Sequence, residues 1–130
     1  MSAVNVEIIK QLYAAFFRQD VGTILELTSP EIEVVQSKEV PWGGVYRGHA
    51  GLQEFFGILR THLENRAAPM ERFLDAGDHV VAIGRTQGLV RANGKAFDVP
   101  LVHVWEIQGG RAVRFRPFID NPTMNACLAK

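Results

Sequence analysis

The sequence has 130 residues, the length of one ordinary domain, and its 47% hydrophobic and 22% charged residues exclude a disordered, collagen-like or coiled-coil chain. Fourteen basic and fourteen acidic residues give a formal net charge of zero, which argues against a nucleic-acid binder. One cysteine, Cys127, cannot close an intramolecular disulfide, and neither a signal peptide nor a membrane-spanning apolar run is visible. We expect one cytoplasmic domain over residues 1–130, with no membrane or nucleic-acid partner.

The first half of the chain carries helical patterns. Between Asn5 and Arg18, apolar residues recur at steps of three and four, which predicts an amphipathic helix with Asn5 as its cap: Val6, Ile9, Leu12, Tyr13, Phe16 and Phe17. Asp20 is the expected N-cap of a short second helix, which Pro30 stops. The β-branched run 32–35 then predicts a strand.

Residues 37–48 contain one proline and three glycines and predict a long irregular loop. Its aromatic residues Trp42 and Tyr46 either cover a pocket or pack on the sheet, and the sequence leaves both open. A third helix is expected over residues 50–64, with these residues on its buried side: Leu52, Phe55, Phe56, Leu59 and Leu63.

The second half of the chain is β-rich. Four strand-like runs are expected over residues 71–76, 79–91, 96–107 and 112–119. Turn signals separate them: Gly77-Asp78, Asn93-Gly94 and Gly109-Gly110. Four runs joined by short turns predict an antiparallel meander, and helices gathered before such a sheet predict an α+β domain with helices on one face.

The sequence shows no pattern typical of a zinc site or a phosphate-binding loop. No two of the four histidines have helical spacing, and a lone cysteine offers no thiolate cluster, so a zinc site is not expected: His49, His62, His79 and His103. The glycine-rich segment 42–48 lacks a phosphate-loop ending, and there is no Gly-x-Ser-x-Gly motif. Acid–base chemistry in a pocket remains.

Asp120 is the main acid–base candidate. It follows the apolar and aromatic end of the last strand, where a carboxyl facing an apolar cavity would have a raised pKa. It also precedes a helix expected over Asn121–Leu128, with Pro122 at an early position, and can simply cap that helix. Both interpretations stay open, and both can hold together.

His103 lies within the β segment Val102-His103-Val104-Trp105, where a lone histidine is either a core residue or a member of a site. Strict alternation along a strand turns only one of Val102 and His103 inward, and the sequence leaves that choice open. Arg114 and Arg116 share one face of the last strand, which favours a solvated or interface face over an anion site.

Three segments together resemble the SnoaL-like, ketosteroid-isomerase-related branch of the nuclear transport factor 2-like superfamily: Tyr46-Arg47-Gly48, Pro100 to Trp105 and Gly110 to Asp120. The resemblance covers nearly the whole chain. It implies a cone-shaped, curved mixed sheet wrapped around N-terminal helices, with an apolar pocket at the open end. It also implies a homodimer through the outer face of the sheet, and no metal or organic cofactor.

Ketosteroid isomerases of this superfamily use a tyrosine on the first helix, an aspartate base after the first strand and an acid on the penultimate strand. Ungapped counting places those positions on Leu12, Gln36 and Val102, with Tyr13 one position away. Because none of the three is retained, we expect no ketosteroid isomerase activity.

Limonene-epoxide-hydrolase-like enzymes use an aspartate–arginine–aspartate set. The two strand positions of that set fall here on Thr86 and Gly84, with Arg85 between them, so only the last aspartate is retained, as Asp120. SnoaL-like polyketide cyclases use an aspartate at the position of Asp120 with a histidine on the neighbouring strand, a pattern that Asp120 and His103 match.

The resemblance therefore implies a cofactor-independent enzyme that isomerises, cyclises or hydrolyses a small apolar molecule. Asp120 would be its general acid/base and His103 its partner. The expected substrate-binding residues are aromatic: Tyr13, Phe17, Trp42, Phe56, Trp105 and Phe118. Two alternatives are a non-catalytic ligand-binding module and a dimeric interaction module whose cavity is filled by its own side chains.

Overall fold

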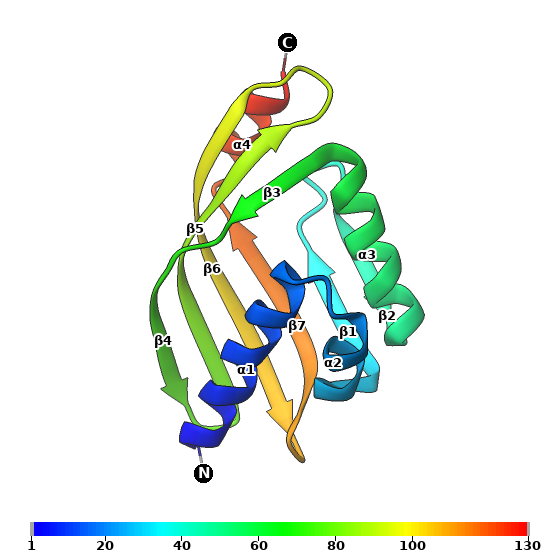
Figure 1. The fold of residues 1–130 in the computed structure, drawn as a ribbon, viewed down its shortest axis with the longest axis vertical. Coiled ribbons are helices and arrows are strands. Elements are labelled where there is room, and N and C mark those ends of the chain that lie inside the picture. The colour runs from blue at the N-terminus through cyan, green and yellow to red at the C-terminus, as the bar shows by residue number, and fades with distance from the viewer. Residues whose placement is uncertain (1, 130) are drawn as a thin grey trace.

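A computed structural model describes residues 2–129 as four helices and seven strands. The helices are α1 (Ser2–Phe17), α2 (Val21–Leu27), α3 (Gly48–His62) and α4 (Asn121–Leu128). The strands are β1 (Thr28–Gln36), β2 (Gly44–Arg47), β3 (Leu63–Ala67), β4 (Met70–Ala76), β5 (His79–Val90), β6 (Ala96–Gln108) and β7 (Arg111–Ile119). Figure 1 shows a strongly curled sheet with α1, α2 and α3 on its concave side and α4 at one end.

The two N-terminal helices begin for different local reasons. α1 begins before Asn5, so the expectation that Asn5 caps it is wrong, and the Asn5 amide instead donates to the Gly77 carbonyl at 3.1 Å. The cap predicted for α2 is confirmed: Asp20 Oδ1 accepts from the Thr23 backbone N–H at 3.1 Å. α2 ends at Leu27, and Thr28 then starts β1.

Two short strands differ from the sequence prediction. Residues 44–47 of the expected loop form β2, which pairs antiparallel with the end of β1. The third helix ends at His62, so Leu63 and Glu64 belong to β3 and not to the helix. A Cβ on Gly88 would lie 2.0 Å from the Glu64 carbonyl oxygen, so glycine at this position lets β3 approach β5 closely. Long-range pairing therefore overrides local helical periodicity here.

The predicted meander is confirmed, because β4, β5, β6 and β7 pair antiparallel in sequence order. The sheet order is β2-β1-β7-β6-β5-β3, with β4 also on β5, and β1 runs parallel to β7. Gly109 and Gly110 both have positive φ, as a two-residue hairpin turn requires. The expectation of such a turn at Asn93-Gly94 is wrong: only Gly94 has positive φ, and a five-residue loop joins β5 to β6.

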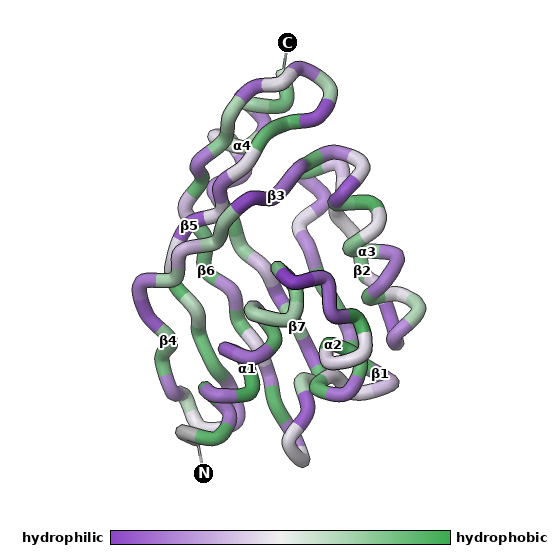
Figure 2. The backbone as a smooth tube through the Cα atoms, viewed as in Figure 1, coloured by the Kyte–Doolittle hydropathy of each residue, from purple (hydrophilic) through white to green (hydrophobic). Residues whose placement is uncertain are grey.

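The core lies between the concave face of the sheet and the helices. α1 packs on β4 and β5, while α3 packs on β1, β2 and β3. Figure 2 shows hydrophobic and hydrophilic residues alternating along the long strands, so that one face of each is apolar. Buried side chains from helices and sheet meet there: Ile9, Leu52, Phe55, Val34, Val99 and Phe115.

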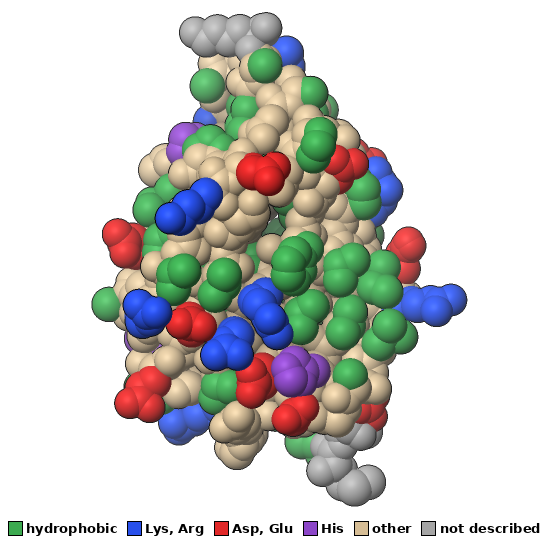
Figure 3. All heavy atoms as spheres, turned by 180° about the vertical axis from the view of Figure 1, so that it is seen from behind, with side chains coloured by type: hydrophobic (Ala, Val, Ile, Leu, Met, Phe, Trp, Pro, Cys, Tyr) green, Lys and Arg blue, Asp and Glu red, His purple; other side chains and the backbone are tan. Residues whose placement is uncertain are grey.

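The outer face of the sheet mixes charged and apolar side chains, as Figure 3 shows from behind. Arg114 forms ion pairs with Glu33 at 3.2 Å and Glu106 at 3.3 Å. Val102 and Phe118 are exposed. The homodimer through this face stays a prediction. None of the helices formed within residues 2–129 is long and apolar enough to cross a membrane.

Candidate functional site

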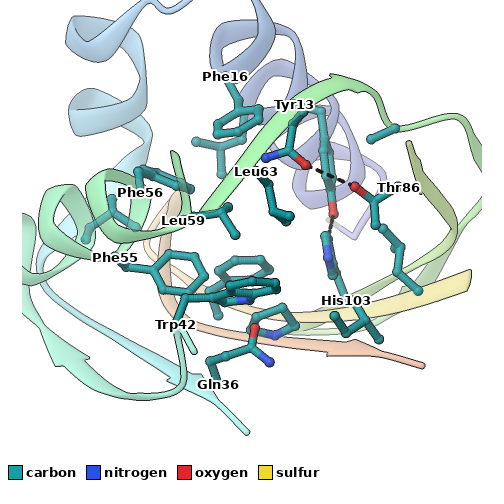
Figure 4. Close-up of a pocket in the computed structure, with 18 of the residues that line it drawn as sticks. Tyr13, Phe16, Gln36, Trp42, Phe55, Phe56, Leu59, Leu63, Thr86 and His103 are labelled. Atoms are coloured by element: carbon teal, nitrogen blue, oxygen red, sulfur yellow. Dashed lines mark hydrogen bonds between the residues drawn. The ribbon is translucent and has the colours of Figure 1, made fainter. Parts of the chain in front are cut away.

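A cavity of about 110 Å³ lies between the concave face of the sheet and helices α1, α2, α3 and α4. Eight aromatic side chains from both layers form part of its wall, and Figure 4 shows several of them pointing inward. They are Tyr13, Phe16, Phe17, Trp42, Phe55, Phe56, Trp105 and Phe115. No Asp, Glu, Lys, Arg or Cys side chain of residues 2–129 lines it.

Tyr13, His103 and Trp105 form a hydrogen-bonded chain in the cavity wall. The Trp105 indole N–H donates to the Tyr13 hydroxyl oxygen at 3.1 Å, and that hydroxyl lies 2.6 Å from His103 Nδ1. The phenol and imidazole planes differ by only 4°, and Figure 4 shows the two rings joined end to end through this bond. One helix and one strand, 90 residues apart, supply the pair.

Burial sets the protonation state of this chain. It lowers the pKa of His103 to about 3, and it raises the pKa of Tyr13 well above its ordinary range despite the hydrogen bond from Trp105. Each side chain keeps some accessible area, but its polar atoms lie deep among protein atoms. At neutral pH, His103 is therefore an uncharged imidazole and Tyr13 an uncharged phenol.

Neutrality also fixes the tautomer of His103. The Tyr13 oxygen already accepts from the Trp105 N–H. If the Tyr13 O–H then donates to His103 Nδ1, each of these two short contacts has one donor and one acceptor. We assign the imidazole proton to Nε2 on that ground. Nε2 has no hydrogen-bond partner within residues 2–129, so it is free to donate to a molecule in the cavity.

Four further polar side chains lie in the wall: Thr28, Gln36, Asn65 and Thr86. Gln36, the last residue of β1, is 4% exposed, and its Nε2 has no hydrogen-bond partner among the described residues. Thr86 on β5 donates to the Asn65 side-chain oxygen of β3 at 3.2 Å. The cavity is thus an apolar space with uncharged hydrogen-bonding groups.

A larger hollow of about 520 Å³ adjoins the cavity. The two share wall residues from α1, α2, α3 and β3: Phe16, Phe17, Ile24, Leu52, Phe56, Leu63 and Asn65. Charged side chains appear only in the hollow, where Arg60, Glu64 and Arg91 line it. The two spaces are therefore neighbours that differ in charge: charged side chains line part of the hollow, and uncharged ones line the cavity.

Asp120 does not face the cavity. Its side chain is exposed, is not part of the cavity wall, and accepts from the Thr123 backbone N–H at 3.1 Å, as the cap of α4. The predicted helix Asn121–Leu128 and its cap are confirmed. The expectation of an inward carboxyl is wrong in this structure, because the chain turns outward at the end of β7 to begin α4.

Phe118 also lies outside the cavity, with 53% of its surface exposed. Pro117 and Ile119, its neighbours on β7, line the cavity instead, since alternation sends Phe118 to the outer face. The other expected substrate-binding residues line the wall: Tyr13, Phe17, Trp42, Phe56 and Trp105. Trp42 is buried in that wall, and Tyr46 packs edge-on against Phe55.

His103 faces inward and Val102 is exposed. Alternation is unbroken along β6, because Phe97, Val99, Leu101, Trp105 and Ile107 are all buried. Val102, the position that ungapped counting assigns to the isomerase acid, therefore faces away from the cavity. On α1, Leu12 and Tyr13 both line the cavity, and Tyr13 carries the polar atom.

Sequence reasoning did not select Gln36, Asn65 or Thr86 as site residues. Gln36 ends an alternating pattern in which Ile32 and Val34 are buried, and this position of a polar residue was the available signal. Asn65 gives no such signal, since the sequence predicts a helix up to Glu64 and no strand after it. Within residues 2–129, no group of three or more His, Cys, Asp or Glu side chains could hold a metal ion.

Comparisons with known proteins agree with this fold. Residues 9–115 match the family model described as SnoaL-like domain. No curated protein matches the sequence. The chain is similar to the crystal structure of a nuclear transport factor 2-like protein of unknown function from Burkholderia pseudomallei, with 26% identity over 98% of both chains and a TM-score of 0.90.

Two other solved structures are informative. TerC, co-crystallised with polyporic acid, is 29% identical over 96% of this chain and 98% of its own, with a TM-score of 0.86. A putative SnoaL-like polyketide cyclase from Jannaschia sp. is 21% identical over 97% of this chain and 92% of its own, with a TM-score of 0.83, a likeness of fold alone.

Proposed function

The chain belongs to the SnoaL-like family, and we propose that it binds a small, uncharged, ring-containing molecule in the cavity between α1, α3 and the sheet. The observation that carries this proposal is an aromatic-walled cavity without a charged side chain. Burying an unpaired charge in such a place costs several kcal/mol, so the enclosed part of the ligand is uncharged.

The cavity volume limits the ligand. An apolar cavity of ~150 Å³ accommodates benzene, so a cavity of about 110 Å³ limits the enclosed part of the ligand to a single ring at most and excludes a fused multi-ring skeleton without rearrangement of the wall. Larger substituents would extend into the adjoining hollow. The likeness to TerC supports binding of ring compounds by this fold, since that protein was crystallised with polyporic acid.

Binding is favoured over the acid–base mechanism first expected. Asp120 is exposed and caps α4, and His103 is too weak a base to hold a proton near neutral pH because burial lowers its pKa to about 3. No carboxylate of the described chain lines the cavity to replace Asp120. The non-catalytic ligand-binding alternative is therefore the function that the geometry supports best.

A cofactor-independent isomerase, cyclase or hydrolase is the second candidate, and the Tyr13–His103 hydrogen bond favours it. The His103 Nε2–H would donate a hydrogen bond to a substrate oxygen while Nδ1 keeps accepting from the Tyr13 O–H. Tyr13 and His103 both stay neutral, as the directions of their pKa shifts require. Such a hydrogen bond polarises a carbonyl.

The proposal is tested with toluene as the probe, followed by methyl NMR and thermal unfolding. Saturating toluene should shift methyl signals of Leu12, Leu59 and Leu63 and raise the Tm. Leu59→Trp, which fills the cavity, should abolish both effects. Val45→Trp on exposed β2 is the matched control and should preserve them. Shifts that persist in Leu59→Trp, or no shifts in the wild type, would contradict the proposal.

The enzyme candidate needs a different readout. Acetophenone in D₂O would be followed by proton NMR for loss of its α-hydrogens, a reaction that needs only carbonyl polarisation and a water base. Exchange accelerated by the wild type and slowed roughly 10²-fold by Tyr13→Phe would favour catalysis. Equal exchange rates with the wild type, with Tyr13→Phe and in buffer would contradict the enzyme candidate and leave ligand binding as the supported function.

A further inference from the structure

Among the described residues of the cavity wall, Gln36 is the one that has a buried side-chain atom without a hydrogen-bond partner. It is 96% buried, being 4% exposed, and its Nε2 has no hydrogen-bond partner within residues 2–129. Burying an amide without a partner destabilises the folded protein. The neighbouring inward positions of β1 are Ile32 and Val34, so an apolar residue would satisfy packing here.

Gln36 and His103 lie in the same row across the sheet. On β7, Pro117 pairs with His103 of β6. β1 runs parallel to β7 with Val34 opposite Phe115, and the same register places Gln36 opposite Pro117. Neighbouring strands are about 4.8 Å apart, so the Gln36 and His103 backbones are roughly 10 Å apart, with Pro117 between them.

Pro117, the residue between these two in the sheet, is apolar. Pro117 is buried and carries no N–H, and it lines the cavity together with both polar residues. Figure 4 shows Gln36 and His103 entering the cavity region from the sheet. His103 offers an Nε2–H, and Gln36 offers both an N–H donor and a carbonyl acceptor.

We infer that Gln36 and His103 bind opposite edges of a single flat ring lying over Pro117. The ligand class is then a small carbocyclic compound with oxygen substituents at two opposite positions: one carbonyl oxygen that accepts from His103, and one hydroxyl or carbonyl that pairs with the Gln36 amide. Gln36 is the residue that determines specificity for the second substituent. This inference rests on the proposed function, because it needs the cavity to bind a ring.

The test compares three probes that differ only at the ring edges: toluene, 4-methylbenzaldehyde and 4-hydroxybenzaldehyde. Dissociation constants would be measured by NMR titration of the wild type, Gln36→Met and Gln11→Met. Methionine matches glutamine in length, and Gln11 on exposed α1 is the control. In the wild type each added oxygen should tighten binding about fivefold, the net effect of one hydrogen bond.

Gln36→Met should weaken the binding of 4-hydroxybenzaldehyde about fivefold and leave the affinity for toluene unchanged. Gln11→Met should change neither affinity. The ¹⁵N signal of His103 Nε2 should shift with both aldehydes and not with toluene, a readout that needs no His103 variant. Equal affinities of the three probes, or an unchanged preference in Gln36→Met, would overturn the inference while the proposed function stands. Failure of toluene itself to bind would overturn both.

Discussion

Two polar regions of the cavity wall differ in how their hydrogen-bonding groups are paired. Where α1 meets β6, Trp105, Tyr13 and His103 form a chain in which only His103 Nε2 lacks a partner within the described residues. At the end of β1, Gln36 is more deeply buried and has none. Proteins provide hydrogen-bond partners for nearly all their buried polar groups. The first region follows this rule, whereas the unpaired amide of the second is an exception that calls for an explanation.

The difference indicates two kinds of contribution to free energy. Pairing in the Tyr13 region stabilises the fold whether or not a ligand is present. The Gln36 amide destabilises the empty protein and gains its partner only from a bound molecule. Substitutions in the two regions should therefore change the free energy of unfolding in opposite directions.

The largest effect is expected from Tyr13→Phe. Removing the hydroxyl leaves the Trp105 N–H and His103 Nδ1 unpaired, which should lower the free energy of unfolding by about 2–4 kcal/mol. Urea unfolding at pH 7.5 measures it. Tyr46→Phe is the control, since its hydroxyl donates to the Trp42 carbonyl at 3.0 Å near the surface of the loop, and it should cost about 1 kcal/mol. Equal costs would contradict the assigned chain.

Acidification should weaken the same region through His103. The pKa of the unfolded histidine is about 6.5 and burial lowers the folded value to about 3, so between these pH values only the unfolded chain binds the proton. Stability is therefore lost as the pH falls below 6.5, by about 2 kcal/mol at pH 5.

Urea unfolding at pH 7.5 and pH 5.0 measures this loss in the wild type and in His103→Gln. The other three histidines are present in both proteins and cancel from the difference. The variant should lose about 2 kcal/mol less than the wild type on acidification. A His103 imidazole that titrates near pH 6.5 by NMR would contradict the prediction.

The opposite sign is expected at Gln36. Gln36→Met removes the unpaired amide and keeps the length of the side chain, so it should raise the free energy of unfolding of the empty protein by about 1–2 kcal/mol. Gln11→Met, at an exposed position, should stay within about 0.5 kcal/mol of the wild type. A destabilised Gln36→Met would mean that the amide has a partner in solution.

The smallest effect is expected outside the cavity, at Asp120. Asp120→Asn keeps a side-chain oxygen that accepts from the Thr123 N–H, and stability should change by less than about 0.5 kcal/mol, whereas Asp120→Ala should cost about 1 kcal/mol. Toluene affinity should be equal in all three proteins. A tenfold loss of affinity in Asp120→Asn would restore Asp120 to the site.

Most of the secondary structure could be predicted because it depends on neighbouring residues. The apolar spacing of α1, the Asp20 and Asp120 caps, and the glycine turn at 109–110 are local features, and each is present as expected. Local sequence also explains why two strands were not predicted. β2 has the composition of a loop, and β3 continues the periodicity of α3. Pairing partners far along the chain decided both strands.

The candidate site followed the same division. Sequence by itself determined an aromatic cavity wall, because apolar residues recur on one face of each element, and it proposed His103 through a family resemblance. Only the tertiary structure decided that His103 faces inward beside Tyr13, that Asp120 turns outward as a cap, and that the Gln36 amide is left without a partner. Those outcomes depend on which residues of α1, β1 and β6 meet, and contacts across 90 residues leave no signal in adjacent sequence.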